Sequence, residues 1–152
     1  SMIKGFSMKD NTEQTIEFFE ADIEYQLDRL DDIRLWLTNL VIEEKCGIEK
    51  IQYIFCTDEY LLGINKQHLG HDYYTDIITF PLNNSKTAIK SDIYISVDRV
   101  IENAKSYDVS TVQEFYRVIA HGLLHLCGYS DATDNEKRIM RERENYYLDK
   151  VL

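Results

Sequence analysis

The stretch HGLLHLCGYSD, residues 121–131, holds two of the four histidines of this chain, His121 and His125. Side chains four residues apart on a helix lie on one face, one turn apart. Neutral imidazole is a common ligand of zinc and related metals, and a pair at this spacing can bind one ion with little rearrangement. Taken alone, the pair fits two interpretations: a metal site, or two histidines that merely share a helix face.

The residues around the pair favour the metal site. The neighbouring residues VIA and LLHLC are apolar, which predicts a mostly buried helix, where unpaired polar groups are costly. Gly128 lets the chain turn sharply, and Asp131, beyond that turn, can bring a carboxylate back over the same face. Three protein ligands with an open fourth position are typical of a catalytic zinc site. Gly122 occupies the place of the general-base glutamate of HExxH peptidases, which argues against their chemistry.

Hydrophobic periodicity along the rest of the chain predicts an α+β domain. Short alternating or apolar segments predict strands at 48–57, 75–81 and 91–97, and either one strand or two short strands within 15–27. Apolar residues at helical spacing predict helices at 28–47, 58–70, 98–109, 111–128 and 133–152. Thr133 and Glu136 have the spacing of a capping box at the start of the last helix. No repeat or linker interrupts the chain, so residues 2–152 are expected to form one domain, a small mixed sheet packed with helices.

Composition and charge narrow the class of protein. The net charge of −10 argues against a protein that holds nucleic acid by bulk attraction alone. Three cysteines without a CxxC pair suit reduced thiols, and Cys127 falls off the histidine face of its helix. The apolar stretch 34–42 is too short and polar to span a bilayer, and residues 3–10 do not resemble a signal peptide. We therefore expect a soluble cytoplasmic protein that does not associate with membranes.

Several motifs resemble one family. HGLLHLCGY is similar to the HGxLHLxGY signature of the YbeY family, bacterial single-strand endoribonucleases that mature ribosomal RNA. TDIITFP at 75–81 resembles that family's T-[DN]-V-L-S-F-P segment, SDIYIS at 91–96 its G-D-[IL] strand, and NKQHLGHD at 65–72 the loop before them. The motifs keep the family's order over about residues 50–150. The resemblance implies an α+β fold with the metal helix at the foot of a cleft.

The resemblance also implies a function. It indicates a zinc-dependent endoribonuclease, specific for single strands, that acts in ribosomal RNA processing and ribosome maturation. One Zn²⁺ per chain is expected on His121, His125 and Asp131, the last being six residues after the second histidine. The expected partners are ribosomal RNA precursors and ribosomal subunit or assembly proteins. Two alternatives stay open: another metal-dependent hydrolase, such as a peptidase, on the same scaffold, and a non-enzymatic ribosome-assembly factor.

Two departures from the family pattern bear on the chemistry. The third ligand in much of the family is histidine, where this chain has Asp131, and a carboxylate adds negative charge and makes a metal-bound water less acidic. The loop arginine associated with RNA cleavage is replaced by Leu69. His71 beside it is a candidate to compensate, and no general base is assigned.

Further residues are candidates for substrate contacts. Basic side chains around the expected cleft suit phosphates, and a loop tyrosine suits base stacking. The substrate-binding candidates are Lys66, Tyr74, Thr75 and Arg99. By contrast, EKRIMRERE at 136–144 alternates in charge, which predicts a solvated, salt-bridged helix face rather than an RNA contact.

Overall fold

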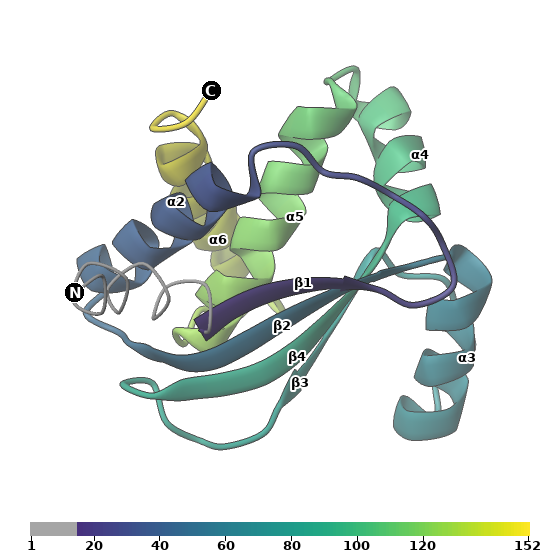
Figure 1. Cartoon of the computed structure of the whole chain (residues 1–152), viewed down its shortest axis with the longest axis horizontal. Coiled ribbons are helices and arrows are strands. Elements are labelled where there is room, and N and C mark those ends of the chain that lie inside the picture. The colour runs from purple at the N-terminus through teal and green to yellow at the C-terminus, as the bar shows by residue number, and fades with distance from the viewer. Residues whose placement is uncertain (1–14) are drawn as a thin grey trace, which may run out of the picture.

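A four-stranded mixed sheet forms the centre of the molecule (Figure 1). The computed structural model describes residues 15–152, so the expectation about a signal peptide at residues 3–10 lies outside the described range. The strands β1 (Ile16–Glu20), β2 (Ile48–Cys56) and β4 (Ile89–Ser96) run parallel, and β3 (Ile77–Pro81) is antiparallel to β4. Their order across the sheet is β1-β2-β4-β3. This arrangement confirms the predicted α+β class and the small mixed sheet.

Five helices surround the sheet in the described part of the chain. They are α2 (Leu30–Glu43), α3 (Asp58–Leu69), α4 (Val97–Tyr107), α5 (Thr111–Leu126) and α6 (Asp134–Leu148). Figure 1 shows α2, α5 and α6 over one face of the sheet and α3 at its far end. Four of these helices start where a Ser or Thr side chain accepts a backbone N–H, which satisfies a donor that the helix leaves free. The predicted capping box of Thr133 and Glu136 is confirmed. No helix within residues 15–152 has the length and apolar character to cross a membrane.

One predicted strand is much shorter than expected. The prediction covered residues 15–27, but β1 ends at Glu20 and the segment that follows is not a strand. The last ladder bond is donated by the Ala21 N–H to the Phe55 carbonyl, and β2 ends one residue later, so the chain beyond has no strand to pair with. Tyr25 instead stacks on Phe115 of α5 at a ring distance of 4.9 Å. The apolar alternation here reflects core packing of an extended segment rather than sheet pairing.

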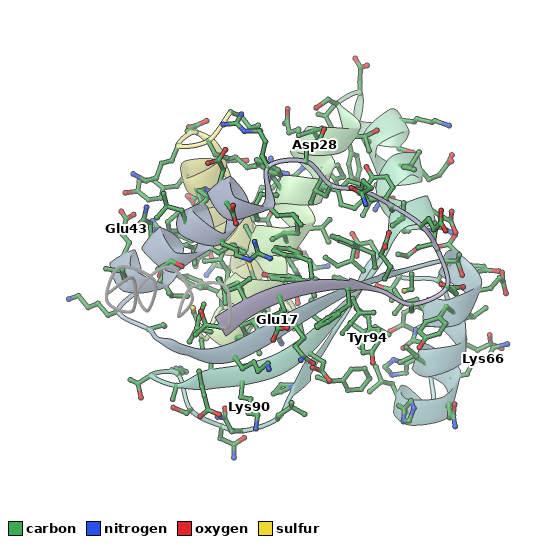
Figure 2. The ribbon with its side chains drawn as sticks, in the orientation of Figure 1. Glu17, Asp28, Glu43, Lys66, Lys90 and Tyr94 are labelled. Atoms are coloured by element: carbon green, nitrogen blue, oxygen red, sulfur yellow. The ribbon has the colours of Figure 1, made fainter. Side chains whose placement is uncertain are left out.

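Two cores lie on opposite faces of the sheet. The larger contains the buried faces of α2, α5 and α6, including Leu37, Phe115 and Ile119. The smaller consists of Cys56, Leu61 and Ile78, with partly buried side chains around it. One of these is Tyr94, which projects from the sheet in Figure 2. Most of the apolar burial therefore lies on the face of the sheet that α2, α5 and α6 cover, and α5 is the helix that carries the histidine pair.

Gly122 permits the close approach of α5 to the sheet. A methyl group on this residue would lie 2.8 Å from Cδ1 of Ile77 and 3.3 Å from Cγ2 of Ile93. These two residues belong to β3 and β4, so the glycine marks the point where the helix meets both strands. A larger residue would push the helix away, and the neighbouring His121 with it.

Replacing Gly122 by alanine should destabilise the protein. Overpacking costs about 1–3 kcal/mol, whereas alanine in a helix gains about 1 kcal/mol over glycine, so we expect a net loss of about 1 kcal/mol in the free energy of unfolding. Gly63 in α3 is a matched control, because a methyl group there would point into open space. Gly63→Ala should stabilise the protein by up to about 1 kcal/mol. Urea unfolding measures both, and equal shifts in the two variants would contradict the packing argument.

Candidate active site

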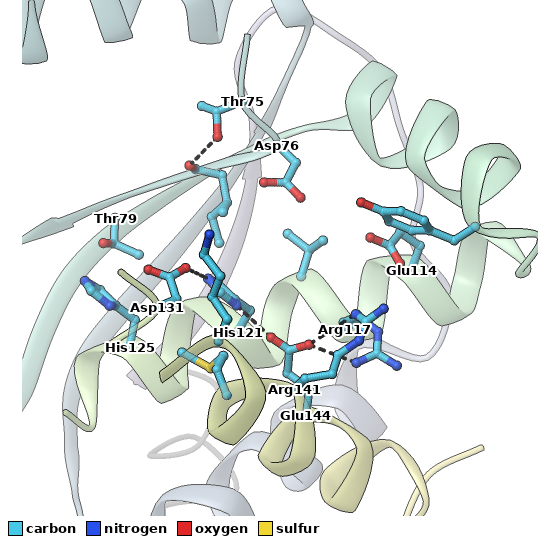
Figure 3. A pocket seen from close by; sticks show the side chains of 15 residues that line it. Thr75, Asp76, Thr79, Glu114, Arg117, His121, His125, Asp131, Arg141 and Glu144 are labelled. Carbon is cyan, nitrogen blue, oxygen red and sulfur yellow. Dashed lines mark hydrogen bonds and ion pairs between the residues drawn. The ribbon is translucent and has the colours of Figure 1, made fainter. Parts of the chain in front are cut away.

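A cavity of about 460 Å³ lies between α5, α6 and the start of β3. Figure 3 shows it from close by. Helix α5 contributes His121 and His125, and the loop after α5 contributes Asp131. Helix α6 contributes Glu144, and Asp76 lies just before β3. The cavity therefore brings together the histidine pair and the aspartate that the sequence singled out, with Glu144 and Asp76 from two further parts of the chain.

Two carboxylates hold His121. Its Nε2 is 3.3 Å from Oδ2 of Asp131, and its Nδ1 is 2.7 Å from Oε2 of Glu144. Burial alone lowers the pKa of His121, but the hydrogen bond to Glu144 and the charges of Glu144 and Asp131 outweigh it and raise the pKa above its usual value. Since a carboxylate only accepts hydrogen bonds, the proton in this contact lies on Nδ1 of His121.

Glu144 is a buried carboxylate with 4% of its surface exposed. Its Oε1 accepts a hydrogen bond of 2.8 Å from Nη1 of Arg117 while its Oε2 contacts His121. Burial raises the pKa of Glu144, but these two partners outweigh burial and lower the pKa below its usual value. Glu144 therefore stays ionised and orients His121 so that Nε2 faces Asp131.

His125 is oriented by the backbone. Its Nδ1 is 3.1 Å from the carbonyl oxygen of Tyr129, and a carbonyl only accepts, so Nδ1 carries the proton in this contact. The lone pair of His125 is then on Nε2, as it is in His121 when Glu144 accepts from Nδ1. Figure 3 shows both imidazoles and Asp131 at the same end of the cavity.

The donor chemistry of this end of the cavity suits a metal ion. Two imidazole Nε2 atoms and one carboxylate form a set that zinc accepts. Within residues 15–152, however, no three His, Cys, Asp or Glu side chains are gathered closely enough to hold an ion as they stand. Cys127 does not line the cavity, as its position on the helix predicts. The residues thus fit a metal by type, and the Nδ1 contacts leave Nε2 of each histidine as the nitrogen that could bind an ion.

A hydrogen-bond network supports the turn that follows α5. The Tyr129 hydroxyl donates to Glu44 at 2.7 Å, Nη2 of Arg143 donates to the same carboxylate at 2.9 Å, and the Tyr147 hydroxyl also donates to it. Burial raises the pKa of Glu44, but these hydrogen bonds outweigh burial and hold the pKa below its ordinary value. Because the Tyr129 carbonyl orients His125, the network fixes the position of that histidine as well.

Glu44→Gln should reveal this network through the pH dependence of stability. The folded pKa of Glu44 lies below the ordinary value of 4.5, so the ionised carboxylate stabilises the fold above that pH. The contribution is lost as the pH falls through the folded pKa. In urea unfolding, the wild type should exceed Glu44→Gln in the free energy of unfolding at neutral pH, and this difference should shrink on acidification. A difference that is constant with pH would contradict the role of the ionised carboxylate.

Only one of the predicted substrate residues lines the cavity. Thr75 does so, whereas the other three lie elsewhere. Lys66 points outward from α3, as Figure 2 shows, and lies 3.4 Å from Asp72. Nη2 of Arg99 donates to Asp58 at 2.8 Å, and its guanidinium lies 5.2 Å from the ring centre of Tyr74. The three residues outside the cavity thus contact other parts of the protein, and Arg99 is already paired.

The two loop positions considered for catalysis also lie outside the cavity lining. His71 stacks on Tyr73 at a ring distance of 5.2 Å, and its Nδ1 contacts the Tyr73 hydroxyl. Leu69 ends α3 with 43% of its surface exposed. Neither residue faces the histidine pair, so the compensation by His71 stays a prediction without a contact to support it.

Several ionisable residues of the cavity were not singled out in the sequence. They are Glu114, Arg117, Lys137, Arg141 and Glu144. Residues 136–144 were expected to be solvated, and an ion pair of 2.5 Å between Arg138 and Glu142 does lie on the exposed face. The residues of α6 that line the cavity nevertheless recur at helical spacing, which is the signal that identifies one face of a helix.

A cavity that gathers imidazoles, carboxylates and cations has the composition of a hydrolase active site. Residues 9–152 match the family model described as Endoribonuclease YbeY. A protein of that name from Cytophaga hutchinsonii is 50% identical over 136 residues, which cover 90% of this chain and 95% of that protein. One from Christiangramia forsetii is 43% identical over 129 residues, covering 85% and 89%. The chain therefore belongs to the YbeY family of endoribonucleases and is an enzyme of the nuclease class.

A solved structure has a similar fold. The solution structure of a Thermotoga maritima protein aligns with a TM-score of 0.65 at 26% sequence identity. The alignment covers 90% of this chain and 89% of that one. The sheet and helices of this chain are thus arranged much as in the Thermotoga maritima protein.

Proposed function

We propose that this chain is a zinc-dependent endoribonuclease that cleaves single-stranded RNA during ribosomal RNA processing and ribosome maturation. The observation that carries the proposal is that His121, His125 and Asp131 line one cavity, while Nδ1 of each histidine contacts another group of the protein, Glu144 or the Tyr129 carbonyl. Nε2 of each ring is therefore the nitrogen that could bind an ion. Membership in a family of endoribonucleases supplies the reaction class. We further propose that residues 2–152 act as one domain, in the cytoplasm, on ribosomal RNA precursors and with ribosomal subunit or assembly proteins.

His121, His125 and Asp131 would hold one Zn²⁺ through two imidazole nitrogens and one carboxylate. When bound, the ion would polarise a phosphate oxygen or lower the pKa of a water molecule. Glu144 and the Tyr129 carbonyl orient the two imidazoles, so little rearrangement of the rings is needed for binding.

Two further carboxyl groups of the cavity are suited to moving a proton. Burial is the main cause of the raised pKa of Asp76, and it is also the main cause of the raised pKa of Glu114. A carboxyl group with a raised pKa exchanges its proton closer to neutral pH, which is what general acid–base chemistry requires. We propose that these two side chains, which both line the cavity, act as the general acid and base. The chain needs such groups because Gly122 occupies the position of the general-base glutamate of HExxH peptidases.

A cleavage assay on three substrates tests the proposed function. The purified protein, with zinc, manganese or magnesium, is incubated with single-stranded RNA, with the matched duplex and with casein. Internal cleavage of the single strand alone is the expected result. Cleavage of casein alone would favour the peptidase-like alternative, and a metal-bound protein that cleaves none of the three would favour the assembly factor. Equal cleavage of duplex and single strand would contradict the strand specificity.

A further inference from the structure

Helix α6 has two charged faces with different surroundings. On one face, Arg138 and Glu142 form an ion pair of 2.5 Å, with 61% and 57% of their side chains exposed. On the other face, Lys137 and Arg141 line the cavity, four residues apart. Side chains at this spacing lie one above the other on a helix, so the two cations form a short row along the cavity wall.

The three cations that line the cavity differ in how strongly each is already paired with acidic or polar groups of the protein. Arg117 is committed, because its Nη1 and Nη2 each donate at 2.8 Å, to Glu144 and to Asn145, and only 14% of its side chain is exposed. Arg141 lies 3.7 Å from Glu144, a carboxylate that Arg117 already occupies, and 54% of its side chain is exposed. Lys137 has no carboxylate oxygen within 4.0 Å among residues 15–152. Two cations thus face the cavity with little internal compensation.

The row of cations lies beside the histidine pair. Glu144 links the two, because one of its oxygens contacts His121 at 2.7 Å while the other is 3.7 Å from Nη1 of Arg141. Of the four carboxyl groups that line the cavity, Glu144 pairs with Arg117 and Asp131 lies 3.3 Å from His121, whereas Asp76 and Glu114 have no ion pair among residues 15–152. On the α6 side of the cavity, an anion would meet Lys137, which has no ion pair among residues 15–152, and Arg141, whose contact with Glu144 is 3.7 Å long.

We infer that Lys137 and Arg141 form a phosphate-binding subsite that holds the backbone of the RNA strand beside the reacting phosphodiester. Lysine supplies a compact charge and arginine a planar fork of donors, and both are suited to phosphate oxygens. Such contacts position a strand without reading its bases, so the subsite serves single-stranded RNA of any sequence. The inference rests on the proposed function, and it replaces Lys66 and Arg99 as the main phosphate contacts.

Salt-dependent RNA binding tests the subsite separately from cleavage. Fluorescence anisotropy with a short labelled single-stranded RNA gives Kd over a range of salt concentrations, and a gel confirms that the RNA stays intact. Lys137→Ala and Arg141→Ala should each weaken binding several-fold and reduce the slope of log K against log salt by about 0.7. Lys137→Arg should retain most of the affinity, because it keeps the charge. Arg138→Ala is the matched control, since it removes one charge from the other face of the same helix.

The pattern among the variants decides the inference. A loss of affinity and slope in Lys137→Ala and Arg141→Ala, with Arg138→Ala close to the wild type, would support the subsite. Equal losses in all three would show that net charge alone attracts RNA, and no loss in the two cavity variants would show that the strand binds elsewhere; either result overturns the inference. Thermal melting checks that each variant is folded. If the wild type binds RNA in this pattern but never cleaves it, the proposed function fails while the subsite stands.

Discussion

Replacing His125 by alanine is expected to abolish the retention of a divalent ion and to lower the rate of RNA cleavage by on the order of a thousandfold. The substitution removes one of the two imidazoles that line the cavity, the one whose Nδ1 contacts the Tyr129 carbonyl. A site left with His121 and Asp131 has too few protein ligands for tight zinc binding. Elemental analysis of the purified wild type and variant, followed by single-turnover cleavage, measures both effects.

The neighbouring positions provide the controls for this prediction. Asp131→Ala should weaken metal affinity by more than tenfold, because it removes the proposed third ligand. Cys127→Ala should leave the affinity unchanged, since Cys127 does not line the cavity. If Cys127→Ala loses the metal and Asp131→Ala keeps it, the ligand assignment is wrong. If His125→Ala retains a full complement of metal, there is no site at this position.

Replacing Glu144 by alanine should have the second largest effect, and it should appear in stability as well as in metal binding. The change leaves the Arg117 guanidinium, 14% exposed, without its carboxylate, and breaking such a buried pair costs about 3–5 kcal/mol. His121 also loses the partner that sets its tautomer, and the loss of such a partner typically weakens metal affinity about 10–100-fold. Urea unfolding and titration with zinc measure the two effects.

Two further variants separate positioning from folding. Glu144→Gln keeps the shape of the side chain and an oxygen acceptor, so it should retain more stability than Glu144→Ala while still lowering metal affinity. Glu142→Ala removes a carboxylate from the exposed face of the same helix and should change neither quantity appreciably. A Glu144→Gln protein with wild-type zinc affinity would show that the carboxylate serves the fold alone.

Much of the local structure follows from local pattern. The spacing of His121 and His125 predicts that they share a face of α5, and both line one cavity. Thr133 and Glu136 predict the start of α6, and the capping box is present. These features depend on residues within one or two helical turns of each other. At that separation, the backbone geometry alone decides which side chains are neighbours.

The sequence could not determine the contacts between segments that are distant along the chain. Nothing near His121 points to Glu144, which is 23 residues later and meets the ring only because α6 packs beside α5. Alternating charge on residues 136–144 is equally compatible with full solvation, and packing alone turns Lys137 and Arg141 toward the cavity while Arg138 stays outside. Local spacing defines the faces of a helix, but the burial of apolar surface against other elements decides which face meets the site.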